Sequence, residues 1–193
     1  MTTNGLKDKL REATHAMHVQ LNHLPLLKGL MEADYTIENY HKLLEAYALL
    51  YQDLELKITR FITEHGVDID YDSRLKAPLI YQDLAYLSRP ASPIQLMLSP
   101  DINSIGALIG VLYVVEGSTL GGQHIARALE KHHGLTEANG ARFFYGYGEA
   151  TPSKWVEFIS YIESIADQPE ECAKAIDNAL KTFELFVSVL NQA

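Results

Sequence analysis

The chain contains very little cysteine and little positive charge. Cys172 is its single cysteine in 193 residues, which excludes an intrachain disulfide and favours a reducing compartment. A formal net charge of −9 at pH 7 argues against nucleic acid as a partner, because phosphate groups require a basic surface. With 47% hydrophobic and 21% charged residues, the composition is that of an ordinary globular protein. We therefore expect a cytoplasmic globular protein that does not bind nucleic acid.

Long apolar runs are also absent from the sequence. The longest run, residues 105–115, is shorter than the roughly 20 residues needed to span a bilayer, and Glu116 closes it. The first twelve residues carry charges where a signal peptide would need an apolar segment. We expect no membrane association and interpret residues 105–115 as part of a buried helix.

Helical periodicity covers nearly the whole chain, and no stretch shows the sustained alternation of a β-strand. The pattern predicts an all-α protein with one domain over residues 1–193. The predicted helices cover residues 5–21, 37–65, 72–87, 101–133, 152–166 and 170–190, with a connector at 89–93 and a loop at 136–150.

Several residues are typical of helix ends. Thr36 is predicted to cap the second helix and Gly66 to follow its last residue. Pro78 is expected to start or kink the regular part of the third helix. Thr151 is predicted to cap the next-to-last helix, with Pro152 at its first position.

The predicted central helix contains three glycines within six residues: Gly117, Gly121 and Gly122. Each glycine weakens a helix interior by about 1 kcal/mol relative to alanine. Two explanations are open. The glycines permit close packing against a neighbouring helix or a bend in the helix axis, or they let a flat ligand lie against bare backbone.

On the first helix, His18 lies at the edge of the apolar stripe, whereas His15 points almost opposite to it. Arg11 lies on nearly the same side as His18, about 10 Å along the axis. Haem requires such a pair, an imidazole for the iron and a guanidinium for a propionate carboxylate. A half-buried histidine with no ligand gives the same pattern. The stripe is formed by Leu6, Leu10, Ala13, Met17 and Leu21.

Five segments together resemble bacterial haem oxygenase, in particular the biliverdin-producing kind that accompanies bacterial phytochromes. The resemblance covers essentially the full chain, and the combination of an upstream histidine with the glycine-rich segment is specific. The segments are THAMHVQL at 14–21, YVVEGSTLGG at 113–122, RFFYG at 142–146, Trp155, and TFELF at 182–186.

The resemblance implies that haem b is held between the first helix and a kinked central helix, as both substrate and cofactor. His18 would bind the iron, and the ring would be opened to biliverdin with release of CO and Fe²⁺, using O2 and external electrons. Gly117, Gly121 and Gly122 would let the distal backbone approach the reacting oxygen closely. Near Ser118, ordered water is expected to supply protons.

Further roles follow from matching positions. By resemblance, Arg11 would meet a haem propionate, and Tyr113 would lie near the haem rim. Arg142 and Tyr145 are further candidates for the propionate side. Phe183 is expected to line the pocket from the last helix, although a plain core position explains it equally well.

The sequence departs from the family pattern at two positions. The mammalian enzymes carry an aspartate where this chain has Ser118, so the distal water must be held differently. Many members carry a glutamate four residues after the proximal histidine, where this chain has Asn22. An amide can accept a hydrogen bond from the second ring nitrogen but gives the imidazole less imidazolate character.

The resemblance also implies partners: an electron donor such as a ferredoxin or flavin reductase, and a bacterial phytochrome as biliverdin acceptor. Two rival functions are considered. A haem carrier or sensor of the same fold would bind haem through His18 without degrading it. A ferritin-like di-iron protein would use the Glu-x-x-His motifs at 12–15 and 38–41, but helical geometry turns both motifs away from the predicted core.

Overall fold

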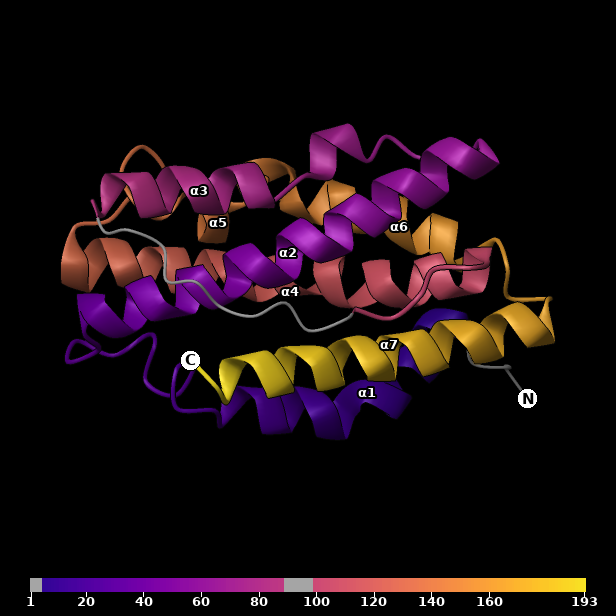
Figure 1. Cartoon of the computed structure of the whole chain (residues 1–193), viewed down its shortest axis with the longest axis horizontal. Helices are drawn as coiled ribbons and strands as arrows, with labels where there is room; N and C mark the ends of the chain where they lie inside the picture. The colour runs from indigo at the N-terminus through magenta and orange to yellow at the C-terminus, as the bar shows by residue number, and fades with distance from the viewer. Residues whose placement is uncertain (1–4, 89–98) are drawn as a thin grey trace.

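The computed structural model describes residues 5–88 and 99–193, which form a bundle of α-helices (Figure 1). These residues contain no β-strand, only isolated bridges at residues 136–140, and the predicted all-α class is confirmed. The helices are α1 (Leu6–Asn22), α2 (Ile37–His65), α3 (Ala77–Tyr86), α4 (Ile105–His133), α5 (Arg142–Tyr145), α6 (Thr151–Glu163) and α7 (Pro169–Leu190), with 3-10 turns η1 (Asp72–Arg74) and η2 (Gly148–Ala150).

The ends of α2 and the start of α3 follow from local sequence. The Thr36 side chain accepts a hydrogen bond from the backbone N–H of Asn39 at 3.1 Å. Gly66 ends α2 in a left-handed conformation, with φ of 60°. Pro78 lies in the first turn of α3, where its missing N–H costs nothing. These three predictions are confirmed.

Two other helices are capped by carboxylates from distant parts of the chain. No side chain of the local N-cap residue bonds to the start of α1 or α5. Instead, Glu163 of α6 accepts hydrogen bonds from the N–H groups of Leu6 and Lys7 at 3.1 and 3.0 Å. Asp83 of α3 accepts from Arg142 and Phe143 at 2.9 and 2.8 Å. Each carboxylate therefore fixes one helix end to another helix.

Helix α4 runs through the centre of the bundle and packs closely on α7. A Cβ atom at Gly106 would collide with the backbone carbonyl of Glu171, and one at Gly110 with that of Ala175. Both glycines therefore permit the two backbones to approach. α4 is long and apolar enough to cross a membrane, but residues 107–112 are buried in the bundle, as expected of a core helix.

Helix α1 and α7 lie side by side along one edge of the bundle, and α3 and α5 lie on the other side of α4 (Figure 1). The buried apolar side chains form one cluster to which every helix contributes. In this arrangement α1 and α4 face the same cavity.

Some sequence-based predictions need correction. Residues 117–122 are part of one uninterrupted α-helix, so the glycines do not interrupt the secondary structure. The predicted loop at 136–150 contains α5 and η2. Thr151 is the first residue of α6 and not its cap, because its hydroxyl instead accepts a hydrogen bond from Gln123 at 3.2 Å. The predicted connector at 89–93 lies outside the described residues.

Candidate active site

A cavity of about 560 Å³ lies between α1 and α4, within the size range of small-molecule sites. Helices α5, α6 and α7 and the segment before α3 also contribute to its walls. The cavity is lined by most of the predicted site residues: Arg11, His18, Tyr113, Gly117, Ser118, Gly121, Gly122 and Phe183.

His18 presents its imidazole to this cavity from α1. Its Nδ1 lies 3.4 Å from the side-chain amide of Asn22, one turn further along the helix. Rotation of the amide would place its oxygen there as an acceptor. The edge of the ring contacts Phe183 of α7, with ring centroids 6.3 Å apart and planes at 78°. No polar partner of Nε2 occurs among the described residues, so this nitrogen is available to bind a metal.

Arg11 of α1 and Tyr113 of α4 both line the cavity. Arg11 is exposed and has no ion-pair partner within the described parts of the chain, so its guanidinium can meet an anionic group of a ligand. Burial raises the pKa of Tyr113, although its hydrogen bond to Thr14 and the charge of Arg11 oppose the shift. The Thr14 hydroxyl donates to the carbonyl of Leu10 at 2.8 Å and can therefore accept from Tyr113.

The three glycines of the central segment have different surroundings. A Cβ atom at Gly121 would meet nothing within 4 Å, and one at Gly117 would touch only the ring of Trp155, at 3.9 Å. At Gly122 a Cβ atom would lie 2.7 Å from the carbonyl oxygen of Phe144. Gly117 and Gly121 therefore leave open space beside the backbone, whereas Gly122 permits close packing against α5.

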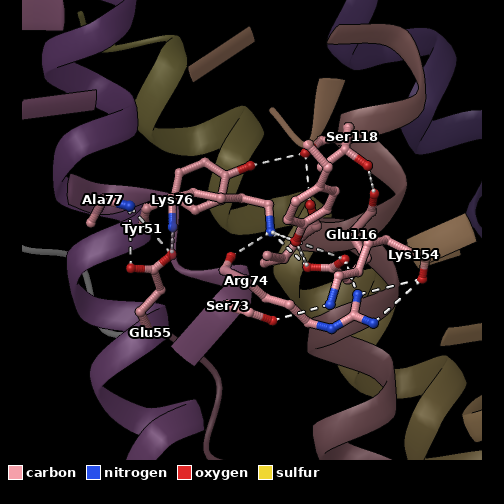
Figure 2. Close-up of polar contacts among 12 residues, drawn as sticks. Tyr51, Glu55, Ser73, Arg74, Lys76, Ala77, Glu116, Ser118 and Lys154 are labelled. Carbon is pink, nitrogen blue, oxygen red and sulfur yellow. Dashed lines mark hydrogen bonds and ion pairs between the residues drawn. The ribbon is translucent and has the colours of Figure 1, made fainter. Parts of the chain in front are cut away.

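Ser118 is joined to α2 by a hydrogen bond with Tyr51 at 3.0 Å (Figure 2). The serine hydroxyl donates to the carbonyl of Val115 at 2.7 Å, so the Tyr51 hydroxyl is the donor between the two side chains. Burial is the main reason that the pKa of Tyr51 is raised. The hydroxyl hydrogen of Ser118 is therefore already hydrogen-bonded to the backbone of α4.

A buried ionic cluster lies beside this serine, and the sequence analysis did not predict it. Glu116 is 1% exposed and binds Arg74 at 2.7 Å and Lys76 at 2.6 Å, one cation on each carboxylate oxygen (Figure 2). Tyr147 donates to the same carboxylate at 3.0 and 3.1 Å. Lys76 and Tyr147 line the cavity. The available signal was a carboxylate within a run of buried apolar residues, which requires charged partners.

Two predicted residues do not reach the cavity. Arg142 donates from Nε to the carbonyl of Glu137 at 3.1 Å, on the outside of α5. Tyr145 is 36% exposed and packs against Gly148. The cavity is lined instead by Phe143 of the same short helix, and by its neighbour Phe144. The structure therefore gives no support to a propionate-binding role for Arg142 or Tyr145.

The described residues contain no group of three histidine, cysteine, aspartate or glutamate side chains that could hold a metal ion. His15 and Glu38 are exposed. His41, which was predicted to face away from the core, is buried, and its Nδ1 lies 3.5 Å from Glu45. No di-iron site is formed by either Glu-x-x-His motif.

The cavity fits a haem group in its chemistry. It offers the His18 imidazole with an available nitrogen, aromatic and aliphatic walls, an exposed guanidinium, and the bare backbone of Gly117 and Gly121. A porphyrin is flat and apolar with anionic propionates, so each of these features has a counterpart in the ligand.

Comparisons with known proteins agree with this reading. The family model described as heme oxygenase matches residues 4–192. A heme oxygenase of Xanthomonas campestris is 26% identical over 166 residues, which cover 86% of this chain and 96% of that protein. The NO- and CO-bound heme oxygenase of Neisseria meningitidis has 21% identity and a TM-score of 0.80, over 98% of this chain and 92% of that one. Heme oxygenase-1 of Synechocystis in complex with heme has 16% identity and a TM-score of 0.76, over 98% of this chain and 92% of that one.

Proposed function

Because the chain belongs to the haem oxygenase family and is a haem-degrading enzyme, we propose that it opens the porphyrin in the cavity between α1 and α4, with His18 as the iron ligand. The main support for this proposal is that the cavity combines an imidazole with an available Nε2 on α1 and open backbone at Gly117 and Gly121 on α4. The products are biliverdin, CO and Fe²⁺.

Haem, when bound, would supply the iron that activates O2 and the ring that is oxidised. The chain's own residues determine its placement. Asn22 orients the imidazole of His18 by its contact with Nδ1. Arg11 would pair with a propionate, and Tyr113 would contact the rim. Phe183, which is 6% exposed, would exclude water from one wall of the cavity.

On the distal side, Gly117 and Gly121 would leave room for oxygen because neither carries a Cβ atom. Gly122 contributes indirectly, since it brings Phe144 of α5 against α4. Ser118 presents an oxygen that is held by Tyr51. This wall can orient a reactant by shape and hydrogen bonding, but it contains no carboxylic acid that reaches the cavity.

The proposal is tested by optical titration of the purified protein with hemin, followed by ascorbate in air. We expect a sharp Soret band that saturates at one hemin per chain and then decays into the broad red absorption of biliverdin. A Soret band that persists under ascorbate would contradict the assignment and favour the haem carrier or sensor. Failure to bind hemin would contradict both.

We further propose that residues 1–193 act as one domain in the cytoplasm, with electrons from a ferredoxin or flavin reductase and a bacterial phytochrome as biliverdin acceptor. The partners rest on the sequence resemblance alone. Cys172 is buried and has no disulfide partner, which suits a reducing compartment. Turnover with a purified ferredoxin and its reductase, compared with a flavin reductase, tests the electron donor.

A further inference from the structure

Lys76 is a buried ammonium group that reaches the active-site cavity. Its side chain is 4% exposed and lines the cavity, immediately before the first residue of α3. Nζ lies 2.6 Å from Glu116 and 3.0 Å from the carbonyl oxygen of Arg74 (Figure 2). It also lies 3.1 Å from the hydroxyl of Tyr147. Each of its three hydrogens therefore has an acceptor.

Charge balance does not require a lysine at this position. Arg74 is also buried and pairs with Glu116 at 2.7 Å, and it extends to Glu157 at 3.2 Å. Because Arg74 is shared between these two carboxylates, a second cation is needed, but an arginine would supply that charge as well as a lysine. The second cation differs from the first in one respect, because an ammonium group can lose its proton whereas a guanidinium cannot.

The surroundings of Lys76 determine how readily the proton leaves. Burial lowers its pKa below the ordinary value for lysine, and the charge of Arg74 acts in the same direction. Glu116 and Glu55 oppose this shift. The oxygens of Glu55 are occupied by the backbone N–H groups of Lys76 and Ala77, so Glu116 is the carboxylate that holds the ammonium.

Two neighbouring hydroxyls on the cavity wall, those of Ser118 and Tyr51, already donate their hydrogens to other groups. The Ser118 hydroxyl donates to Val115, and the Tyr51 hydroxyl donates to Ser118. Burial raises the pKa of the Tyr51 phenol and also that of Tyr147, but the Tyr147 hydroxyl accepts a hydrogen bond from Lys76 and can take a proton as it gives one. The neighbouring phenol of Tyr71 is also buried, with a raised pKa, and it does not line the cavity.

We propose that Lys76 is the side-chain proton donor of the ring-opening reaction and that it acts through the hydroxyl of Tyr147. This inference rests on the proposed function. Rotation of the phenolic O–H turns its hydrogen from Glu116 toward the cavity. The Tyr147 proton passes to an oxygen in the cavity while the phenolic oxygen takes a proton from Nζ. Lys76 is left as a neutral amine, which regains a proton from solvent along the same hydroxyl.

Substitution of Lys76 by arginine separates proton donation from charge. Lys76→Arg keeps a cation beside Glu116 but gives it a group that does not deprotonate. We expect hemin binding and thermal stability close to wild type, with single-turnover ring opening slowed about 100-fold, the scale of general acid catalysis. The solvent deuterium isotope effect and the pH dependence should both change. Wild-type turnover with an unchanged pH profile in this variant would overturn the inference.

Tyr147→Phe provides a second test in case the arginine does not fit. It removes one hydroxyl and leaves both cations on Glu116, and we expect a similar loss of turnover. Lys154→Arg is the matched control, because Lys154 lies near the cluster but pairs with Glu157 at 3.8 Å outside the cavity. A Tyr147→Phe enzyme as fast as wild type would contradict the relay.

A measurement on the haem-free protein gives a readout independent of turnover. The Nζ resonance of Lys76, identified by its loss in Lys76→Arg, should titrate below the value of about 10.4 that is ordinary for lysine. Its hydrogens should exchange with water more slowly in Tyr147→Phe. Unchanged exchange would contradict the relay. A wild-type protein that binds hemin without degrading it would instead contradict the proposed function, and with it the basis of this inference.

Discussion

The side-chain amide of Asn22 lies 3.4 Å from Nδ1 of His18, one helical turn away on α1. The contact holds the imidazole from within its own helix, and the ring also packs edge-to-face with Phe183 of α7. In the proposed role of iron ligand, His18 would therefore be oriented by a neutral group. Its basicity would be set by an amide rather than by a carboxylate.

Substitution of Asn22 tests this relationship. Asn22→Leu should weaken hemin binding by about tenfold, because loss of a partner to a ligating histidine typically costs 10–100-fold in affinity. Asn22→Glu should lower the reduction potential of bound haem, since a carboxylate gives the imidazole more imidazolate character. Hemin titration and spectroelectrochemical titration measure these two effects. Equal potentials in wild type and Asn22→Glu would show that the amide does not act on the ligand.

Removal of His18 should abolish the reaction without unfolding the protein. The side chain is exposed in the haem-free protein, so His18→Ala should leave thermal stability within about 0.5 kcal/mol. We expect loss of the proximal ligand, an altered Soret band and little biliverdin under ascorbate. His124→Ala is the control, because His124 is an exposed histidine of α4 that does not line the cavity. Full turnover by His18→Ala would exclude His18 as the ligand.

Substitutions of the α4 glycines should have different effects, because the surroundings of these glycines differ. Gly122→Ala should lower the free energy of unfolding by about 1–3 kcal/mol, because the added methyl would press on the carbonyl of Phe144. Gly121→Leu should leave the fold intact and hinder oxygen binding or change the position of ring opening. Thermal unfolding of the haem-free protein and analysis of the biliverdin isomer measure these outcomes. A Gly121→Leu enzyme with wild-type rate and product would show that the open space beside Gly121 is not needed for the reaction.

Glu116→Gln should be severely destabilising. The substitution leaves Lys76 buried without its carboxylate partner and leaves Arg74 paired only with the exposed Glu157, and breaking a buried ion pair in this way costs about 3–5 kcal/mol. Denaturant unfolding of the haem-free protein measures the change. Glu157→Gln is the comparison, because that side chain is 57% exposed and its loss should cost little. Similar stabilities of the two variants would contradict this account of the cluster.

Alkaline pH should unfold the protein cooperatively. Burial raises the pKa of Tyr40, Tyr47, Tyr51 and Tyr147 well above the ordinary value of about 10. The folded state thus keeps protons that the unfolded state releases, so the stabilising contribution is present below pH 10 and is lost as the pH rises above it. Tyrosinate absorbance should increase together with the loss of helical circular dichroism. Ionisation of these tyrosines in a fully helical protein would contradict their burial.

Much of the fold could be predicted from local sequence. The bounds of α2 follow from Thr36 and Gly66, whose effects act within one turn. Helix α5 could not be predicted in this way, because the cap that starts it is Asp83, 60 residues before Phe143. The tertiary structure determines which residue caps α5.

The candidate site likewise contains residues that local sequence predicts and residues that it does not. His18 and Arg11 follow from spacing on one helix, and both line the cavity. The difference between Gly121 and Gly122 depends on α5, and no pattern within α4 distinguishes them. Glu116 signals that buried cations must exist, but Lys76 lies 40 residues away in sequence. Charge alone does not identify it.

The cap on α1 also bears on how the protein is made. His18 is synthesised early, yet the N–H of Leu6 is satisfied by Glu163, 157 residues later in the chain, and α7 packs along α1 only after that. A chain still on the ribosome displays the histidine without the helices that hold it in place. We therefore expect haem capture to follow the synthesis and packing of α6 and α7.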